Sequence, residues 1–116
     1  MGGFSFAREA RLLEANAYKR VFDGADTKAS HKYFLLLGRS NNLNHNRLGL
    51  VIAKKNIRLA VQRNRIKRVA REFFRTHPAE NQGLDVIFLA RKGADQLDNA
   101  ALSSILRQQW QKLTQQ

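Results

Sequence analysis

The stretch that most constrains how this chain can fold runs from Lys54 to Arg75 and reads KKNIRLAVQRNRIKRVAREFFR. It carries nine of the 21 Lys and Arg residues, against a single acid, Glu72. From Val61 onward its apolar residues recur at spacings of three and four, the pattern of one helix face. These residues are Ile66, Val69, Ala70, Phe73 and Phe74. The pattern predicts a long helix that buries this stripe and ends before Pro78, because the residue preceding a proline avoids helical geometry.

The other side of this predicted helix is almost purely cationic. At about 100° per residue, the residues that fall away from the apolar stripe are Asn64, Lys67, Arg68, Arg71 and Arg75. Arg63 and Arg65 lie in the first turn, where cations oppose the positive end of the helix dipole, so we expect an anionic group such as phosphate beside them. The alternative is a merely solvated face, but solvated helices usually mix charges for i, i+4 pairing, and Glu72 alone offers a partner here.

Length and charge limit the class of protein. At 116 residues and 13.3 kDa the chain is expected to form one domain, residues 1–116, with 1–7 flexible. A net charge of +12 and a pI near 11.2 indicate a polyanionic partner. No apolar run approaches the roughly 20 residues of a membrane span, and no signal peptide is recognised at the start. We therefore expect a cytoplasmic protein that does not bind membranes.

The sequence offers no catalytic or metal-binding constellation. It has no cysteine, which excludes disulfides and thiolate chemistry. His31, His45 and His77 are far apart, and none has a second ligand at the spacing of a metal site. The acids are scattered, and their close pairs sit in turn-like or capping contexts. We expect no catalytic residue and no metal site in this chain.

Other segments predict a small sheet covered by helices. Residues Glu14 to Phe22 read as a short helix that Gly24 ends. Strands are predicted at Lys32 to Arg39 and at Arg47 to Ala53, on either side of a polar, turn-forming stretch, and we expect them to pair as an antiparallel hairpin. A continuous apolar run from Leu84 to Arg91 predicts a third strand, central in the sheet.

The last segment reads as an amphipathic helix with Asp98 as its N-cap. Its predicted buried residues are Leu102, Ile105, Leu106, Trp110 and Leu113, and the residues predicted to face water are Gln108, Gln109 and Gln111. The whole is an α+β fold in the order α-β-β-α-β-α, with room for one further short strand and with helices packed on a small mixed sheet.

Two aromatic residues of the first helix admit two interpretations. Leu13, Ala17, Tyr18, Val21 and Phe22 share one face. The simpler interpretation of Tyr18 and Phe22 is core packing, which is the usual role of aromatic residues at i, i+4 spacing. The other is that they line a cleft and contact nucleotide bases.

Residues Ala60 to Glu72, preceded by Lys54-Lys55, resemble the signature of the protein subunit of bacterial ribonuclease P. The specific part is Arg63-Asn64-Arg65 followed by Lys67-Arg68, placed shortly after a strand that ends in two lysines. Further stretches that match are Arg11-Leu12 before Tyr18-x-x-Val21-Phe22, the Leu48-Gly49-Leu50 strand, and Ala90-Arg91-Lys92-Gly93. The resemblance covers essentially the whole domain.

The resemblance implies a fold and a function. The family's fold is ribosomal protein S5 domain 2-like, with a left-handed crossover through the basic helix, where the general rule for crossovers favours the right-handed form. Its members bind a catalytic RNA subunit, one protein to one RNA, and the complex is an endoribonuclease that removes the 5′ leader of precursor tRNA. The RNA holds the catalytic Mg²⁺ ions and performs the hydrolysis, so the chain would be an RNA-binding subunit without catalytic residues.

By matching position, the resemblance also implies two sets of contacts. The residues that would face the RNA subunit are Lys54, Lys55, Arg63, Asn64, Arg65, Lys67, Arg68 and Arg71. The residues that would line a cleft for the single-stranded leader are Tyr18, Phe22, Phe34 and Leu36. Arginine forks suit phosphates, and aromatic rings stack on unpaired bases without demanding a sequence.

Three other functions fit parts of the sequence. Composition alone would suit a ribosomal-type structural RNA-binding protein without a processing role. A helix-turn-helix DNA-binding protein is disfavoured, because a strand and two lysines stand where a short first helix and tight turn are needed, so we expect no DNA partner. A nuclease acting alone would require a partner for His31, His45 or His77 that the sequence does not display.

Overall fold

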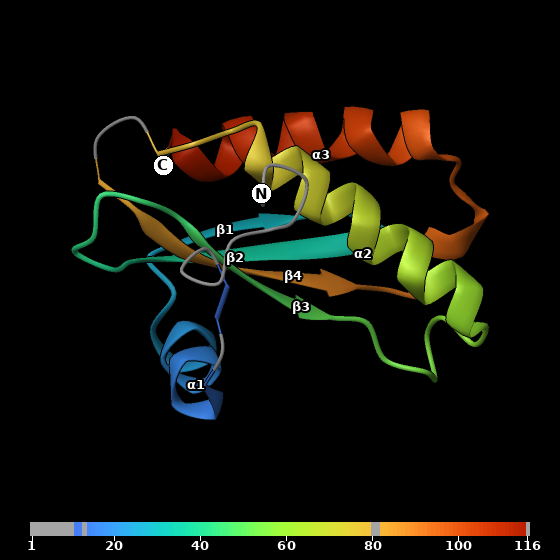
Figure 1. The fold of residues 1–116 in the computed structure, drawn as a ribbon, viewed down its shortest axis with the longest axis horizontal. Helices are drawn as coiled ribbons and strands as arrows, with labels where there is room; N and C mark the ends of the chain where they lie inside the picture. The colour runs from blue at the N-terminus through green and yellow to red at the C-terminus, as the bar shows by residue number, and fades with distance from the viewer. Residues whose placement is uncertain (1–10, 13, 80–81, 116) are drawn as a thin grey trace, which may run out of the picture.

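Four strands form one mixed sheet, with two long helices on one face and a shorter helix on the other (Figure 1). The computed structural model describes residues 11, 12, 14–79 and 82–115. Its elements are α1 (Ala15–Gly24), β1 (Thr27–Ser30), β2 (Phe34–Ser40), β3 (Arg47–Val51), α2 (Ala60–Arg75), β4 (Leu84–Ala90), η2 (Ala94–Gln96) and α3 (Asn99–Thr114). The predicted α+β order is confirmed, with β1 as the additional strand. The expected flexible segment 1–7 and Leu13 lie outside the described residues.

The sheet has the strand order β1-β2-β4-β3. β4 is central, as predicted: it pairs antiparallel with β2, with Leu37 opposite Ile87, and parallel with β3, with Gly49 opposite Ile87. The predicted hairpin of β2 with β3 is therefore wrong. The connection of residues 41–46 spans the width of β4 instead of making a tight turn. Asn42, at φ 60, takes the left-handed conformation that Asn tolerates well.

Hydrogen bonds to the carboxylate of Asp85 hold the connection between β2 and β3 in place. Arg47 donates to Asp85 from Nε (2.7 Å) and Nη2 (2.6 Å), and these two residues are paired across β3 and β4. Asn41 donates to the same carboxylate (2.9 Å) and accepts from the backbone N–H of Leu43 (2.9 Å). Residues at both ends of the connection are thus tied to Asp85, near the start of the central strand.

The main core lies between the sheet and the pair α2 and α3. Its fully buried members include Phe34 and Phe88 from the sheet, Ile66 from α2 and Leu106 from α3. A smaller core lies on the opposite face, where Ala17 and Val21 of α1 pack on the sheet. The apolar side chains of β2 and β4 alternate between these two cores, as the pleat requires.

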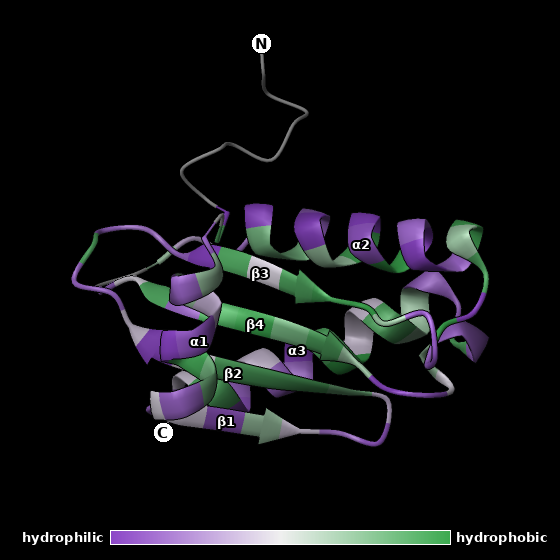
Figure 2. Ribbon diagram, turned by 90° about the horizontal axis from the view of Figure 1, so that it is seen from below, coloured by the Kyte–Doolittle hydropathy of each residue, from purple (hydrophilic) through white to green (hydrophobic). Residues whose placement is uncertain are grey.

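The parallel pair β3 and β4 is joined by a crossover through α2. In Figure 2 both strands run from left to right with β3 above β4, and α2 and α3 lie behind the sheet. Turned so that the strands point upward, the chain passes from left to right behind the sheet, which is a left-handed crossover. About 98% of such connections are right-handed, so the family resemblance predicted the hand and the general rule did not.

The two long helices follow their predicted stripes, with one exception. In α2 the buried residues are Ile66, Ala70, Phe73 and Phe74. In α3 the Asp98 carboxylate accepts from the N–H of Ala101 (2.8 Å), which confirms the predicted N-cap. Gln109 was predicted to face water, but only 1% of it is exposed. It lies four residues before buried Leu113 on the same face, so the stripe of α3 includes an amide that composition alone assigns to the surface.

Candidate nucleic-acid interface

The outer side of α2 is an exposed cationic surface. Asn64, Arg68 and Arg71 are exposed and Lys67 is half-buried, on the side of the helix away from the core. Lys54 and Lys55 are exposed in the turn that follows β3. We call these six residues the α2 cationic surface. Within the described residues, their side chains make no hydrogen bond or ion pair, so their charges stay available to a ligand. Figure 2 shows the hydrophilic turns of α2 pointing away from the sheet.

The acid of this segment does not neutralise that surface. Glu72 accepts from Arg75 at Nε (3.1 Å) and Nη2 (2.5 Å), three residues along the helix. These hydrogen bonds hold the pKa of the Glu72 carboxyl below its ordinary value, so it stays ionised and committed to Arg75. The charges of Lys67, Arg68 and Arg71 are therefore left uncompensated along the helix.

Arg63 and Arg65 differ from the rest of the predicted RNA-binding set, because their guanidinium groups contact the protein itself. Arg63 donates from Nη1 to the backbone carbonyls of Ile57 (2.9 Å) and Arg58 (2.8 Å). Arg65 donates from Nε to Gln62 (2.8 Å) and from its two other nitrogens to Asn99 (2.9 Å) and the carbonyl of Asp95 (3.1 Å). Both residues are half-buried. Oxygen atoms of the chain thus occupy places where we expected an anionic ligand.

The two aromatic residues of α1 take different positions. Tyr18 is half-buried and lies over Gly49 of β3, so closely that a Cβ at Gly49 would be 2.7 Å from the tyrosine ring. Phe22 is 45% exposed, although Val21 beside it is fully buried. The simpler interpretation, core packing for both, holds for part of the Tyr18 ring and fails for Phe22. Phe22 is a large apolar side chain exposed on α1.

Phe34 and Leu36 do not belong to the face that carries Tyr18. Both have no exposed surface and pack in the main core, beneath α2 and α3. Side chains alternate along β2, so the residues that share the α1 face are Leu35 and Leu37. The prediction of Phe34 and Leu36 as cleft residues is therefore wrong by one position of the strand.

The face of the sheet beside α1 carries half-buried apolar residues that the sequence analysis did not single out. They are Leu35 of β2, Val51 of β3 and Leu89 of β4, which occupy one row of the sheet. Strand parity is the signal that could have found them, since each lies an even number of positions from a residue that packs under α1. With Tyr18 and Phe22 they form what we call the α1-side face.

A hollow at the edge of the sheet connects this face with the α2 cationic surface. It has a volume of about 280 Å³. Tyr18 lies on one side of it, Lys67 and Arg71 of α2 on the other, and Leu48 and Leu50 of β3 between them, with Arg11 and Leu12 completing the wall. The charges of Lys67 and Arg71 and the aromatic ring of Tyr18 are thus brought within one site, although some fifty residues separate them in sequence.

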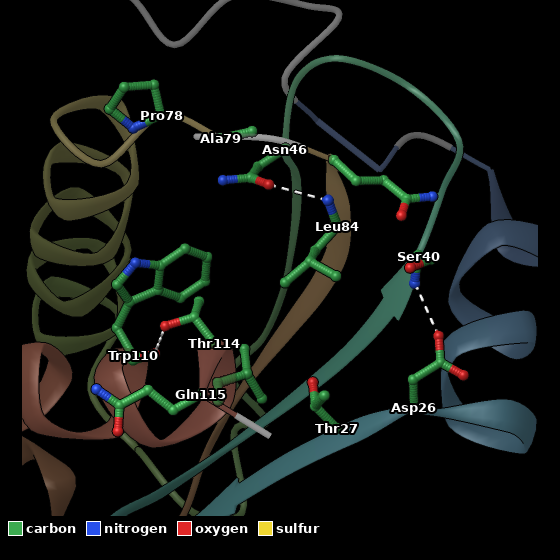
Figure 3. Close-up of a pocket in the computed structure, with 12 residues that line it drawn as sticks. Asp26, Thr27, Ser40, Asn46, Pro78, Ala79, Leu84, Trp110, Thr114 and Gln115 are labelled. Atoms are coloured by element: carbon green, nitrogen blue, oxygen red, sulfur yellow. Dashed lines mark hydrogen bonds between the residues drawn. The ribbon is translucent and has the colours of Figure 1, made fainter.

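A second hollow, of about 730 Å³, lies at the far end of α3 (Figure 3). Trp110, Leu84 and Leu113 form its apolar part, and Asp26 and Asn46 are among its polar residues. In Figure 3 Asp26 accepts from the backbone of Ser40, and Asn46 accepts from the N–H of Leu84, each at 2.9 Å. None of the residues that line it is Lys or Arg. It therefore lacks the charge that a phosphate backbone needs and is distinct from the surfaces described above.

His31 and His77 make contacts within the fold. His31 accepts at Nδ1 from the N–H of Tyr33 (3.1 Å), and the ring of His77 stacks on Phe73 with centroids 3.9 Å apart. Burial, with nearby Lys112, Arg91 and Lys32, lowers the pKa of His31. Among the residues that the structure describes, no three of His, Asp and Glu come together as a group that could hold a metal ion. No helix in the described part of the chain is long and apolar enough to cross a membrane.

This fold and these surfaces define a small basic RNA-binding type of protein, and comparison with known proteins identifies the family. The family model for ribonuclease P matches residues 6–114. The ribonuclease P protein component of Marinobacter nauticus is 47% identical over 113 residues, which cover 97% of this chain and 85% of that protein. That of Stutzerimonas stutzeri is 48% identical over 109 residues, covering 94% and 83%.

Comparison with solved structures identifies the same family. The ribonuclease P protein of Staphylococcus aureus superposes with a TM-score of 0.80 at 26% identity, over 88% of this chain and 93% of that one. That of Thermotoga maritima gives 0.72 at 26% identity, over 87% and 96%. The chain therefore belongs to the ribonuclease P protein family. Its role is that of the protein subunit of ribonuclease P in the processing of tRNA 5′ ends.

Proposed function

We propose that the α2 cationic surface binds the RNA subunit of ribonuclease P. The observation that carries this proposal is a set of cationic side chains on one exposed helix side, without partners among the described residues, beside an acid that is already committed to Arg75. Ordinary surface charges are compensated locally, whereas uncompensated ones suit a polyanion. Each phosphate contact releases counterions, so binding should depend steeply on salt.

The α1-side face takes the single-stranded leader of precursor tRNA in this proposal. Phe22 and Tyr18 offer ring surface for stacking on unpaired bases, and Leu35, Val51 and Leu89 offer an apolar floor. Such contacts tolerate any base, which suits a protein that meets many leaders. The hollow between Tyr18, Lys67 and Arg71 would let one strand pass from stacking contacts to phosphate contacts without leaving the surface.

The chemistry belongs to the RNA subunit in this proposal, and so do the Mg²⁺ ions. The described residues do not fit a magnesium site, because they bring no three acids or histidines together. What the chain's own residues do is hold phosphates and stack bases, which lowers the repulsion between two polyanions. We further propose one protein to one RNA, acting on precursor tRNA in the cytoplasm, without catalytic residues in this chain.

A charge-matched pair of variants tests the RNA-binding surface. Lys67→Gln with Arg71→Gln removes two cations from the α2 cationic surface, and Arg20→Gln with Arg107→Gln removes two exposed cations from α1 and α3. The logarithm of affinity for the ribonuclease P RNA should depend on the logarithm of salt less steeply in the first variant, by about 0.7–0.9 per lost contact. The second variant should keep the slope of the unchanged protein. Equal slopes in the two variants would remove α2 from the interface.

Cleavage of precursor tRNA separates this proposal from a ribosomal-type RNA-binding role. Both predict salt-dependent RNA binding, and only the ribonuclease P role predicts an effect on leader removal. The same two variants, assayed for cleavage with the RNA subunit at low Mg²⁺, should differ in rate at limiting protein. Salt-dependent binding with no effect of the protein on cleavage would favour the ribosomal-type role.

A further inference from the structure

We infer that Arg63 and Arg65 are positioning residues, which brace the two loops at the start of α2 instead of contacting RNA phosphates. This inference rests on the proposed binding of RNA by α2 and changes how that site works. Seen by sequence alone, both arginines belong to one cationic motif with Lys67 and Arg68. Seen in the structure, they face two sides of the helix, and both are turned onto the protein.

Arg65 ties α2 to the junction between η2 and α3. Its three nitrogens donate in three directions: to the side chain of Gln62 in α2, to the carbonyl of Asp95 in η2, and to the side chain of Asn99, the first residue of α3. Figure 1 shows the starts of α2 and α3 on the same side of the molecule, with the η2 segment between β4 and α3. A planar guanidinium holds its N–H donors on three separate nitrogens at fixed angles, whereas the three donors of an ammonium group all lie on one nitrogen and cannot reach the same three acceptors in this geometry.

Arg63 ties α2 to the loop that precedes it. One nitrogen, Nη1, donates to two successive carbonyls, those of Ile57 and Arg58. Leu59 at the N-cap makes no side-chain hydrogen bond, so the N-cap side chain does not fix this loop to the helix. The same loop begins with Lys54 and Lys55, so the position of these lysines relative to α2 depends on Arg63.

The braces also explain why cations are tolerated in the first turn of α2. A positive charge there is unfavourable by a few tenths of a kcal/mol, because it meets the positive end of the helix dipole. Carbonyl and amide oxygens on both sides of the helix offset that cost in the free protein. The outward side of the turn is then left to Asn64, and the phosphate contacts to Lys67, Arg68 and Arg71.

The test replaces the planar guanidinium group of each arginine with the single charged nitrogen of lysine. Arg65→Lys and Arg63→Lys keep the charge and remove the geometry, and Arg68→Lys is the matched control on the exposed side of the same helix. The charge that a phosphate contact contributes to the salt slope survives the exchange to lysine, whereas a brace of hydrogen bonds from three nitrogens does not. Three quantities are measured: the Tm of the free protein, amide hydrogen exchange, and the salt slope of binding to the ribonuclease P RNA.

We expect Arg65→Lys to lower the Tm by roughly 5–10 °C and to speed exchange at Ala101 and Leu102, the first amides of α3 held by Asp98. We expect Arg63→Lys to speed exchange at Asn56 and Ile57, which are bonded to Ala53. Affinity should fall in both variants at an unchanged salt slope. Arg68→Lys should keep the Tm, the exchange rates and the slope.

The glutamine variants complete the test. Arg68→Gln should reduce the salt slope by about 0.7–0.9 at an unchanged Tm, and Arg65→Gln should lower the Tm and leave the slope close to that of Arg65→Lys. The inference would be overturned if Arg65→Lys left the Tm and the hydrogen-exchange pattern unaltered. It would also be overturned if Arg65→Gln reduced the salt slope by as much as the loss of one phosphate contact. The Tm and exchange measurements use the free protein, so they decide the bracing role even where RNA binding by α2 fails its own test.

Discussion

We predict that Gly49→Ala weakens leader binding because it displaces the ring of Tyr18, and that Tyr18→Ala suppresses this effect. Gly49 is buried in the middle of β3, beneath the ring of Tyr18. A Cβ at Gly49 would lie 2.7 Å from Cε1 and Cζ of Tyr18 and 2.9 Å from its hydroxyl oxygen. Carbon atoms in contact are about 3.5–4.0 Å apart, so the ring would have to move by about 1 Å.

The size of the effect follows from this displacement. Inserting one methyl into a packed site typically costs about 1–3 kcal/mol of stability. Stacking of a base on an aromatic ring contributes about 1–3 kcal/mol, so a displaced ring would weaken leader binding by roughly 5- to 150-fold. Mature tRNA lacks the leader, so its affinity for the assembled ribonuclease P should stay nearly constant.

A double-mutant cycle with Tyr18→Ala is the assay. Urea unfolding and the affinities for precursor and mature tRNA are measured for both single variants and for the double variant. Tyr18→Ala vacates the space that the new methyl enters, so Gly49→Ala should cost little in that background. Full stability and full precursor affinity of Gly49→Ala would refute the reasoning. A cost that persists in the Tyr18→Ala background would place the clash elsewhere.

Three further predictions concern the fold and the α1-side face. Asp85→Ala leaves Arg47 and Asn41 without their shared acceptor and should lower the free energy of unfolding by about 2–3 kcal/mol, because the side chains of Arg47 and Asp85 are only 28% and 10% exposed. The control is Asp23→Ala, which breaks the ion pair of Lys19 with Asp23. These side chains are 74% and 64% exposed, so the free energy of unfolding should change by less than about 0.5 kcal/mol. The pKa of His31 is lowered in the folded protein, so the contribution of His31 to stability is present above the ordinary value of 6.5 and is lost as the pH falls. When urea unfolding is measured at pH 7.5 and at pH 5.5, His31→Asn should lose less free energy of unfolding on acidification than the unchanged protein. Phe22→Ala should weaken precursor binding more than mature tRNA binding at an unchanged Tm, and equal losses for the two RNAs would return Phe22 to a structural role.

The helices were predictable because each is defined by its own periodicity. The apolar stripe of the basic segment predicted a helix from Val61 to the neighbourhood of Pro78, and α2 runs from Ala60 to Arg75. Asp98 was identified as an N-cap from residue type and position alone. Such features depend on neighbours within one or two turns, which a sequence displays directly.

Strand pairing could not be read so directly, because it depends on residues far apart in the chain. The polar connection after β2 favoured a hairpin with β3. The uninterrupted apolar run of β4, however, had already indicated a strand with a neighbour on each side. The strands before it were the available neighbours, so combining the two observations would have placed β4 between β2 and β3. The short strand β1 gave no signal, since Ala29 is its only buried residue.

The sequence identified many residues of the candidate site, but it showed less of how their side chains are arranged in space. Sequence distinguished the cationic side of α2 from its apolar side, and it drew attention to Tyr18 and Phe22. It did not distinguish Leu35 from Leu36, because a run of three leucines carries no alternation to show which residues face the core. It also could not show that Arg63 and Arg65 contact the protein, since their acceptors lie in loops and include backbone carbonyls.

The most direct test of the central claim is cleavage of precursor tRNA at low, near-physiological Mg²⁺. Three mixtures are compared: the protein alone, a bacterial ribonuclease P RNA alone, and the two together. We predict cleavage at the mature 5′ end only, or much faster, when both are present, because the protein supplies phosphate and leader contacts and the RNA supplies the chemistry. Cleavage by the protein alone, or an RNA activity that the protein leaves unchanged, would contradict the account.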